Sequence, residues 1–374
     1  MSFGIYIHSP WCSLRCSYCA FTVYVDKNPP FEEWKQGIIA NWLWNSNYMQ
    51  VETTIPKSIY FGGGTPSLLP ISTIEDILDV LPHDSNTEIT IEMNPEDITS
   101  ETLYRYHQLG INRLSVGIQT FHPKHAKLLR RSHTVEQAHQ ILQTIQQSPI
   151  KNWSFDLIFG LPDQSLADLQ YDLDFIKTIQ PPHVSLYGLT YEKGTPLTRA
   201  AKRNKIIPLD EDIWEQQLDC ITQTLVEQGY RRYEISNFSK HGFEARHNEH
   251  TWKGGFYVGL GPSAHGYLPD FNRTRYDSDY QKWLQQTVPH LEQSSLEQRM
   301  MDLILTQIRH IDGISLKTIE KLGYQCNMRQ LQPYIDHNLL LYESNTRIKL
   351  GSQGWNVVDS LTLHIIEATH PITK

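Results

Sequence analysis

From Phe3 to about Phe238, short runs rich in β-branched and aromatic residues alternate with longer amphipathic segments, at a spacing of roughly thirty residues. This alternation predicts successive βα units, in which neighbouring parallel strands are joined by crossover helices. The expected strands are 3–7, 58–61, 88–93, 113–118, 153–159 and 183–187. The expected helices are 31–49, 74–81, 100–109, 135–147, 166–179 and 210–228. Six units predict an α/β fold, as a parallel sheet or partial (β/α)6 barrel.

After residue 238 the alternation stops. Residues 245–266 are rich in His, Trp and Gly without a clear period, which predicts an irregular connector. Helical periodicity returns in 296–308, 315–322 and 328–338, and two short β-like runs follow in 340–350 with a turn at 343–346. We therefore expect a small C-terminal helical domain with a hairpin, similar in plan to a winged helix. The predicted divisions are 1–235, 236–285 and 286–374.

Charge and hydropathy exclude some classes of protein. The chain has 33 Lys and Arg against 41 Asp and Glu, a net charge of −8, which argues against electrostatic binding of nucleic acid. No stretch of eighteen or more apolar residues and no secretory signal is present, so we expect a cytoplasmic protein without a transmembrane segment. A transient contact with a membrane surface and a homodimer both stay open, since no strongly basic amphipathic helix decides the first.

Three of the five cysteines lie within eight residues, at Cys12, Cys16 and Cys19. This C-x3-C-x2-C spacing can bind three irons of a four-iron cluster and leave the fourth iron without a protein ligand. A structural zinc site is the alternative, with His8 as a fourth ligand, but no second cysteine pair supports it. A reducing compartment keeps such thiols free for metal.

Polar and glycine residues gather where the expected strands end. Since the carboxyl ends of parallel strands build one mouth, these residues should converge. Their types suit a zwitterionic nucleoside, with a carboxylate for an ammonium, an Arg for a carboxylate, and Asp or Gln for hydroxyls or base edges. A tight turn and solvated surface positions are the alternatives. The residues are Gly63, Gly64, Glu92, Gln119, Arg131 and Asp156.

The cysteine motif with Tyr18, followed by the run Gly-Gly-Gly-Thr-Pro at 62–66, resembles the radical S-adenosylmethionine superfamily, specifically the group around oxygen-independent coproporphyrinogen III oxidase. The resemblance implies a [4Fe-4S] cluster on Cys12, Cys16 and Cys19, with S-adenosylmethionine chelating the open iron. It implies that the methionine end is lined by Tyr6, the backbone of Tyr18, Gly63, Gly64, Thr65 and Glu92. It further implies that Gln119, Arg131 and Asp156 contact this S-adenosylmethionine or a second one.

The sequence departs from the oxidase in two places. Phe21 stands where that enzyme has a further cysteine, and only eleven residues precede Cys12. Downstream, residues 247–252 read His-Asn-Glu-His-Thr-Trp and resemble the H-N-x-x-Y-W motif of HemW-type heme chaperones, with Thr251 in the tyrosine position. This resemblance implies that His247 is an axial heme ligand. A hydrogen-bonded connector histidine is the alternative, and His250 is a second candidate ligand.

Two functions follow from these resemblances. The first is a heme chaperone that binds heme and transfers it to acceptor proteins, with respiratory proteins expected among them, using the cluster and S-adenosylmethionine. The second is an oxygen-independent coproporphyrinogen III oxidase, in which the cluster cysteines serve catalysis. Both imply the same cluster, so its presence does not separate them.

Overall fold

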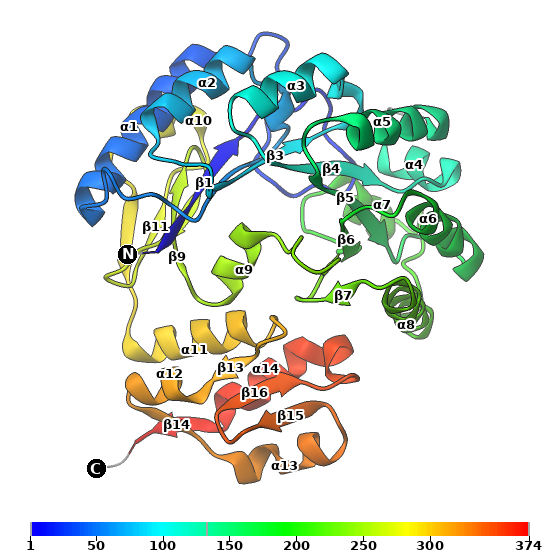
Figure 1. Cartoon of the computed structure of the whole chain (residues 1–374). Helices are drawn as coiled ribbons and strands as arrows, with labels where there is room; N and C mark the ends of the chain where they lie inside the picture. Colours follow the sequence, from blue (N-terminus) through cyan, green and yellow to red (C-terminus); the bar gives the residue numbers. More distant parts are fainter. Residues whose placement is uncertain (1, 132–133, 373–374) are drawn as a thin grey trace.

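The computed structural model describes residues 2–131 and 134–372, so the outermost residues of the first and last predicted divisions, 1, 373 and 374, lie outside the described residues. Six parallel strands pair in chain order at its centre (Figure 1). They are β1 (Phe3–Ser9), β2 (Ser58–Gly63), β3 (Glu88–Met93), β4 (Arg113–Gln119), β5 (Asn152–Phe159) and β6 (His183–Gly188). The predicted α/β architecture and all six predicted strands are confirmed.

Helices cover the outer face of the curved sheet (Figure 1). Their sequences carry their own start signals: Thr134 and Ser165 each form a capping box with the third residue of the helix that follows. The predicted helices are confirmed, and α4 and α7 were not predicted. The helices are α1 (Phe31–Met49), α2 (Ile71–Val80), α3 (Ser100–Gln108), α4 (Pro123–Leu129), α5 (Val135–Gln147), α6 (Leu166–Ile179), α7 (Pro196–Lys202) and α8 (Glu211–Glu227).

The prediction of an irregular connector at 245–266 is wrong. This segment forms α9 (Arg246–Trp252), β9 (Phe256–Leu260) and β10 (His265–Tyr267), and β9 pairs with β1 in parallel, with Phe256 opposite Phe3. The sheet continues through β11 (Asn272–Arg275) and β12 (His290–Gln293), while β7 (Arg231–Arg232) and β8 (Asn237–Ser239) extend its other edge. Glycines on both sides of β9 and within it hide its apolar pattern.

The C-terminal part has a second hydrophobic core, separate from the one around the sheet, built on residues such as Ile304, Leu340 and Ile365. The predicted helices with a hairpin are confirmed. The elements are α10 (Tyr280–Leu284), which still packs on α1, then α11 (Leu296–Gln307), α12 (Leu316–Lys321), α13 (Met328–Asp336), α14 (Val358–Glu367), β13 (Ile314–Ser315), β14 (Tyr324–Cys326), β15 (Leu340–Glu343), β16 (Arg347–Leu350) and β17 (Thr369–Pro371).

Helix α9 lies between the two cores, against β1 and β2 on one side and α11 on the other (Figure 1). On the α11 side, the Gln307 side chain donates to the Lys253 carbonyl at 3.1 Å, and buried His310 lies 3.4 Å from the Glu249 carboxylate. Helix α9 therefore contributes to the junction between the sheet and the C-terminal domain, together with contacts such as the Arg273–Asp302 ion pair and the hydrogen bond from the Ile311 N–H to the Tyr233 carbonyl.

Candidate functional site

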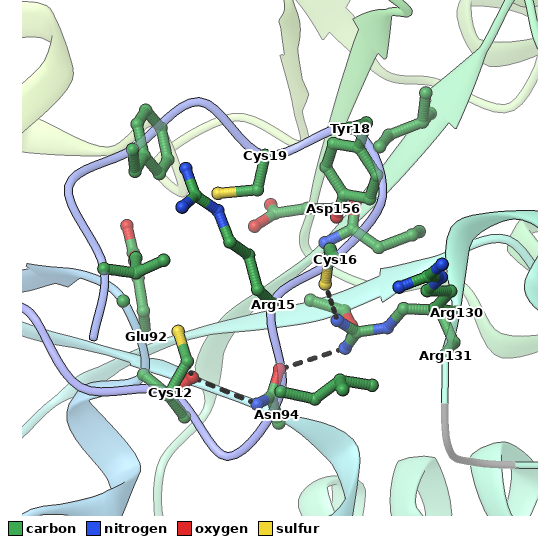
Figure 2. A pocket seen from close by; sticks show the side chains of 18 of the residues that line it. Cys12, Arg15, Cys16, Tyr18, Cys19, Glu92, Asn94, Arg130, Arg131 and Asp156 are labelled. Atoms are coloured by element: carbon green, nitrogen blue, oxygen red, sulfur yellow. Dashed lines mark hydrogen bonds between the residues drawn. The ribbon is translucent and has the colours of Figure 1, made fainter. Parts of the chain in front are cut away.

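A cavity of about 500 Å³ opens at the carboxyl ends of the central strands (Figure 2). The loop after β1 brings Cys12, Cys16 and Cys19 to it, as the parallel topology predicts. The other predicted site residues that line it come from the ends of β2 to β5, from the cysteine loop itself and from the segment after α4. They are Tyr18, Gly63, Gly64, Thr65, Glu92, Gln119, Arg131 and Asp156.

The cysteine loop is held in place by the backbone around it. The Cys12 N–H donates to the Tyr24 carbonyl at 2.9 Å, and the Ser17 hydroxyl donates to the Leu128 carbonyl at 3.0 Å. The loop is thus held to the rest of the fold at its start and in its middle.

Two donors reach the sulfurs. The Thr65 hydroxyl lies 3.4 Å from Cys12 Sγ. Arg131 Nη1 lies 3.5 Å from Cys16 Sγ (Figure 2). Burial raises the pKa of Cys12 to about 11, although the Thr65 hydrogen bond opposes this. The three thiols share one loop, with a neutral and a cationic hydrogen-bond donor beside their sulfur atoms. This environment suits cysteines that bind a cluster better than it suits free thiolates, since metal binding removes the thiol protons.

The glycine turn serves the fold as well as the cavity. Gly63 has a φ of +112°, and a Cβ on Gly64 would lie 2.6 Å from the Trp11 carbonyl oxygen, so both positions require glycine. The Gly63 N–H donates to Glu92 at 3.1 Å and the Gly64 N–H to the Ser9 carbonyl at 2.7 Å. In this conformation both N–H groups are therefore bonded within the fold.

Two carboxyl groups lie deep in the cavity wall. Glu92 accepts hydrogen bonds from Tyr60 at 2.9 Å and from the Gly63 N–H, and Asp156 accepts from Ser115 at 3.2 Å. Burial raises the pKa of Glu92 to about 7 against its hydrogen bonds, and Asp156 adds to the rise. Burial also raises the pKa of Asp156. An ammonium group entering here would favour the ionised forms.

Arg131 connects several groups of the cavity. It donates to Asn94 Oδ1 at 3.0 Å and to the Gly117 carbonyl, and Asn94 in turn donates to the Thr65 hydroxyl at 3.2 Å (Figure 2). Asn94 is a site residue that the sequence reasoning did not select, although it directly follows β3, in which Glu92 is the last residue but one. The strand-end rule alone was enough to find it.

Gln119 has a φ of +73°, uncommon for a residue other than glycine, where the pairing of β4 with β5 shifts register after Gly117. Such a bulge re-aims a side chain at the end of a strand. Tyr187 at the end of β6 also lines the cavity and was not predicted.

Tyr6 does not line this cavity. Its hydroxyl lies 3.1 Å from His8 Nδ1, its ring packs on Tyr60, and it borders a smaller neighbouring cavity with Phe21 and His265. Burial raises the pKa of Tyr6, as expected for a phenol enclosed within the sheet.

His247 lies away from the cysteines, against the first residues of the strands. Its Nδ1 is 2.8 Å from the Ser58 hydroxyl, and the side chain is only 8% exposed. Its backbone N–H donates to the Glu88 carboxylate at 3.0 Å. Burial lowers the pKa of His247 to about 3, so the imidazole is neutral. His250 Nε2 lies 2.9 Å from the Phe256 carbonyl. The structure does not bring either histidine to the cysteine cavity.

The sequence model of the radical SAM superfamily matches residues 6–176 of this chain. The heme chaperone HemW of Buchnera aphidicola is 36% identical over 274 residues, which are 72% of this chain and 71% of that protein. The chain belongs to the HemW family. Heme chaperone HemW of Escherichia coli is 34% identical over 70% of this chain and 69% of its own, and that of Synechocystis 33% over 82% and 77%.

The HemW-family fold is close to a solved structure of coproporphyrinogen III oxidase (HemN) from Escherichia coli. The two superpose with a TM-score of 0.81 over 97% of this chain and 89% of the oxidase, at 18% identity. At this identity the likeness shows the shared fold. No helix within residues 2–131 and 134–372 has the length and apolarity needed to cross a membrane.

Proposed function

We propose that this HemW-family protein binds heme and hands it to acceptor proteins, with the aid of a [4Fe-4S] cluster and S-adenosylmethionine. The observation that carries the proposal is the convergence of three cysteines and the strand-end residues on one cavity, in a chain whose relatives are described as heme chaperones. Respiratory proteins are the acceptors we expect, and a homodimer is compatible with this role.

Cys12, Cys16 and Cys19 would hold the cluster, and Thr65 and Arg131 would donate hydrogen bonds to its sulfur ligands. When bound, the cluster supplies an iron with an open position for the amino and carboxylate groups of S-adenosylmethionine. The residues for that ligand are Gly63, Gly64, Glu92, Gln119, Asp156 and the backbone of Tyr18. Tyr6 would act indirectly, because its ring packs on that of Tyr60, which donates a hydrogen bond to Glu92.

Ligation of heme iron by His247 is part of the proposal and places a condition on α9. The imidazole is engaged with Ser58, and the first N–H groups of α9 are bound to Glu88. For a porphyrin to reach the imidazole, α9 must move away from β2 and β3. The apparent heme affinity is then the affinity of the open form multiplied by the fraction of molecules in which α9 is open.

The first experiment is a heme titration of the cluster-loaded protein, followed by the Soret band. Wild type should give a saturable shift, and His247→Ala should lose it. His250→Ala tests the second candidate ligand, and His241→Ala, at an exposed position, is the control that should leave the titration unchanged. Identical titrations of wild type and His247→Ala would remove His247 from the proposal.

The second experiment separates the chaperone from a coproporphyrinogen III oxidase on the same preparation. Reduced, cluster-loaded protein is incubated with S-adenosylmethionine and coproporphyrinogen III, and products are separated by chromatography. The proposal expects the substrate to be returned unchanged. Conversion to a tricarboxylic product or to protoporphyrinogen would overturn it in favour of the oxidase.

A further inference from the structure

Outside the cysteine cavity, two histidines and a carboxylate come together where α4 and α6 begin. His122 precedes α4, His125 lies in its first turn, and Asp168 lies in the first turn of α6. One ligand atom from each residue lies within 4.8 Å of the others. None of the three lines the cysteine cavity. We propose that these three residues form a second metal site, selective for Zn²⁺ or a similar borderline divalent cation.

The distances suit such an ion. His122 Nε2 lies 3.4 Å from Asp168 Oδ1, and His125 Nε2 lies 3.2 Å from Asp168 Oδ2. Ligands at about 2.0 to 2.1 Å from a tetrahedral zinc are separated by about 3.3 to 3.4 Å. An ion can therefore enter between the rings and the carboxylate with small side-chain rotations.

The two rings make few hydrogen bonds to the described residues. Among the described residues, the His122 ring has no hydrogen-bond partner, and its Nδ1 is buried. His125 is fully buried, and only its Nε2 is bonded, to Asp168, while its Nδ1 is unpartnered. Because Nδ1 of each ring has no partner in the described part of the chain, no hydrogen bond at that atom opposes a rotation that turns Nε2 toward a cation beside Asp168.

The site is open to solvent on one side. Zinc binds neutral imidazole and ionised carboxylate, which are the side chains gathered here. His122 and Asp168 are partly exposed, at 23% and 21%, which leaves access for the ion and for water as a fourth ligand.

Two other groups touch the carboxylate. The Ser165 N–H donates to Oδ2 at 3.0 Å, and Lys124 Nζ lies 4.0 Å from the same oxygen. Lys124 is 54% exposed and donates to the Asp163 carbonyl. Its ammonium group therefore does not depend on the Asp168 carboxylate when a cation binds there. Oδ1 lies beside His122 and Oδ2 beside His125, so both carboxylate oxygens face the proposed cation.

A metal here would fix the start of α4 to the start of α6. The other end of α4 leads into Arg131, and its Leu128 carbonyl accepts the hydrogen bond from Ser17 in the cysteine loop. Zinc would therefore stabilise the helix against which the cysteine loop is held. This effect is separate from heme binding, so the site and the proposed function stand or fall independently.

The test uses the full chain in a Cys12→Ser, Cys16→Ser, Cys19→Ser background, because the three thiols also bind zinc. Metal-depleted protein is titrated with Zn²⁺ against a chelating dye, and bound metal is counted by elemental analysis. We expect one Zn²⁺ per chain. His125→Gln and Asp168→Asn should weaken binding by about 100-fold or more, since each removes a metal ligand. The exposed-position variant His241→Gln should bind as the parent does.

Asp168→Asn keeps an oxygen for the Ser165 N–H, so it separates the loss of the metal ligand from the loss of the helix cap. Thermal unfolding gives a second readout: Zn²⁺ should raise the melting temperature of the parent and not of either variant. Co²⁺ in place of Zn²⁺ should give the visible spectrum of tetrahedral nitrogen and oxygen ligands. Zinc binding that is absent in the parent, or equal in parent and both variants, would overturn the proposal.

Discussion

The anchoring of α9 by Glu88 gives a prediction that links stability to heme binding. Glu88 is 1% exposed at the start of β3, and its two oxygens accept the N–H groups of Arg246 and His247, each at 3.0 Å. Arg246 also pairs with it through a half-exposed guanidinium, which adds little. Ala245 provides no side-chain cap, so this carboxylate takes that role from another element.

Glu88→Gln keeps one acceptor oxygen and turns the other into a donor that faces an N–H group. A hydrogen bond to a charged group contributes about 1.5 to 3 kcal/mol and a neutral one about 1, so the closed position of α9 should lose about 2 kcal/mol. If α9 must open for heme to reach His247, a loss of about 2 kcal/mol raises the open population, and with it the heme affinity, by about 30-fold while opening remains rare.

The assays are urea unfolding and heme titration on the same preparations, with Glu52→Gln at an exposed position as the control that changes neither. We expect Glu88→Gln to lower the unfolding free energy and tighten heme binding. A loss of stability below about 0.5 kcal/mol would refute the anchoring role, because surface changes have effects of that size. Lower stability with unchanged or weaker heme affinity would refute the opening of α9.

Three further predictions concern the domain junction and the cavity. His310 and Lys253 hold the pKa of the Glu249 carboxyl group at about 2, below its ordinary 4.5. The stability that the ionised carboxylate gives the fold is therefore complete above pH 4.5 and is lost as the pH falls toward 2. Between pH 4.5 and pH 2, the unfolding free energy of Glu249→Gln, measured with urea, should therefore fall by about 1 to 2 kcal/mol less than that of wild type. Gly64→Ala should destabilise by about 1 to 3 kcal/mol in thermal unfolding, since its Cβ meets a backbone oxygen; an unchanged melting temperature would contradict this. Arg131→Lys should weaken S-adenosylmethionine binding, measured by calorimetry, by about tenfold, because an ammonium cannot hold the planar fork of contacts that includes Asn94; equal affinity would count against this role.

The sequence predicts the six central strands well because each is a short apolar run next to a long amphipathic helix, and both patterns are local. The cysteines and most of the cavity residues follow, since parallel strands end at one edge. Asn94 could have been found by the same rule. Its bond to Arg131 could not, because it depends on how the chain passes from α4 back to the cavity.

The error at 245–266 has a different cause. Helix α9 receives its cap from Glu88, which lies far away in the sequence, and β9 is stable because it pairs with β1. Neither partner is visible in the local pattern. His247 was judged by a motif in an expected loop, whereas the burial that lowers its pKa results from the return of the chain to the first strand.

The pairing of β1 also sets an order of events during synthesis. One edge of β1 can pair with β2 once residues 58–63 have left the ribosome, whereas the other edge lacks its partner β9 until residues 256–260 have left it. Through that interval an open strand edge lies directly beside the cysteine motif, and open edges invite pairing with other chains. A nascent chain stalled before β9 would therefore expose an open strand edge next to its three clustered cysteines.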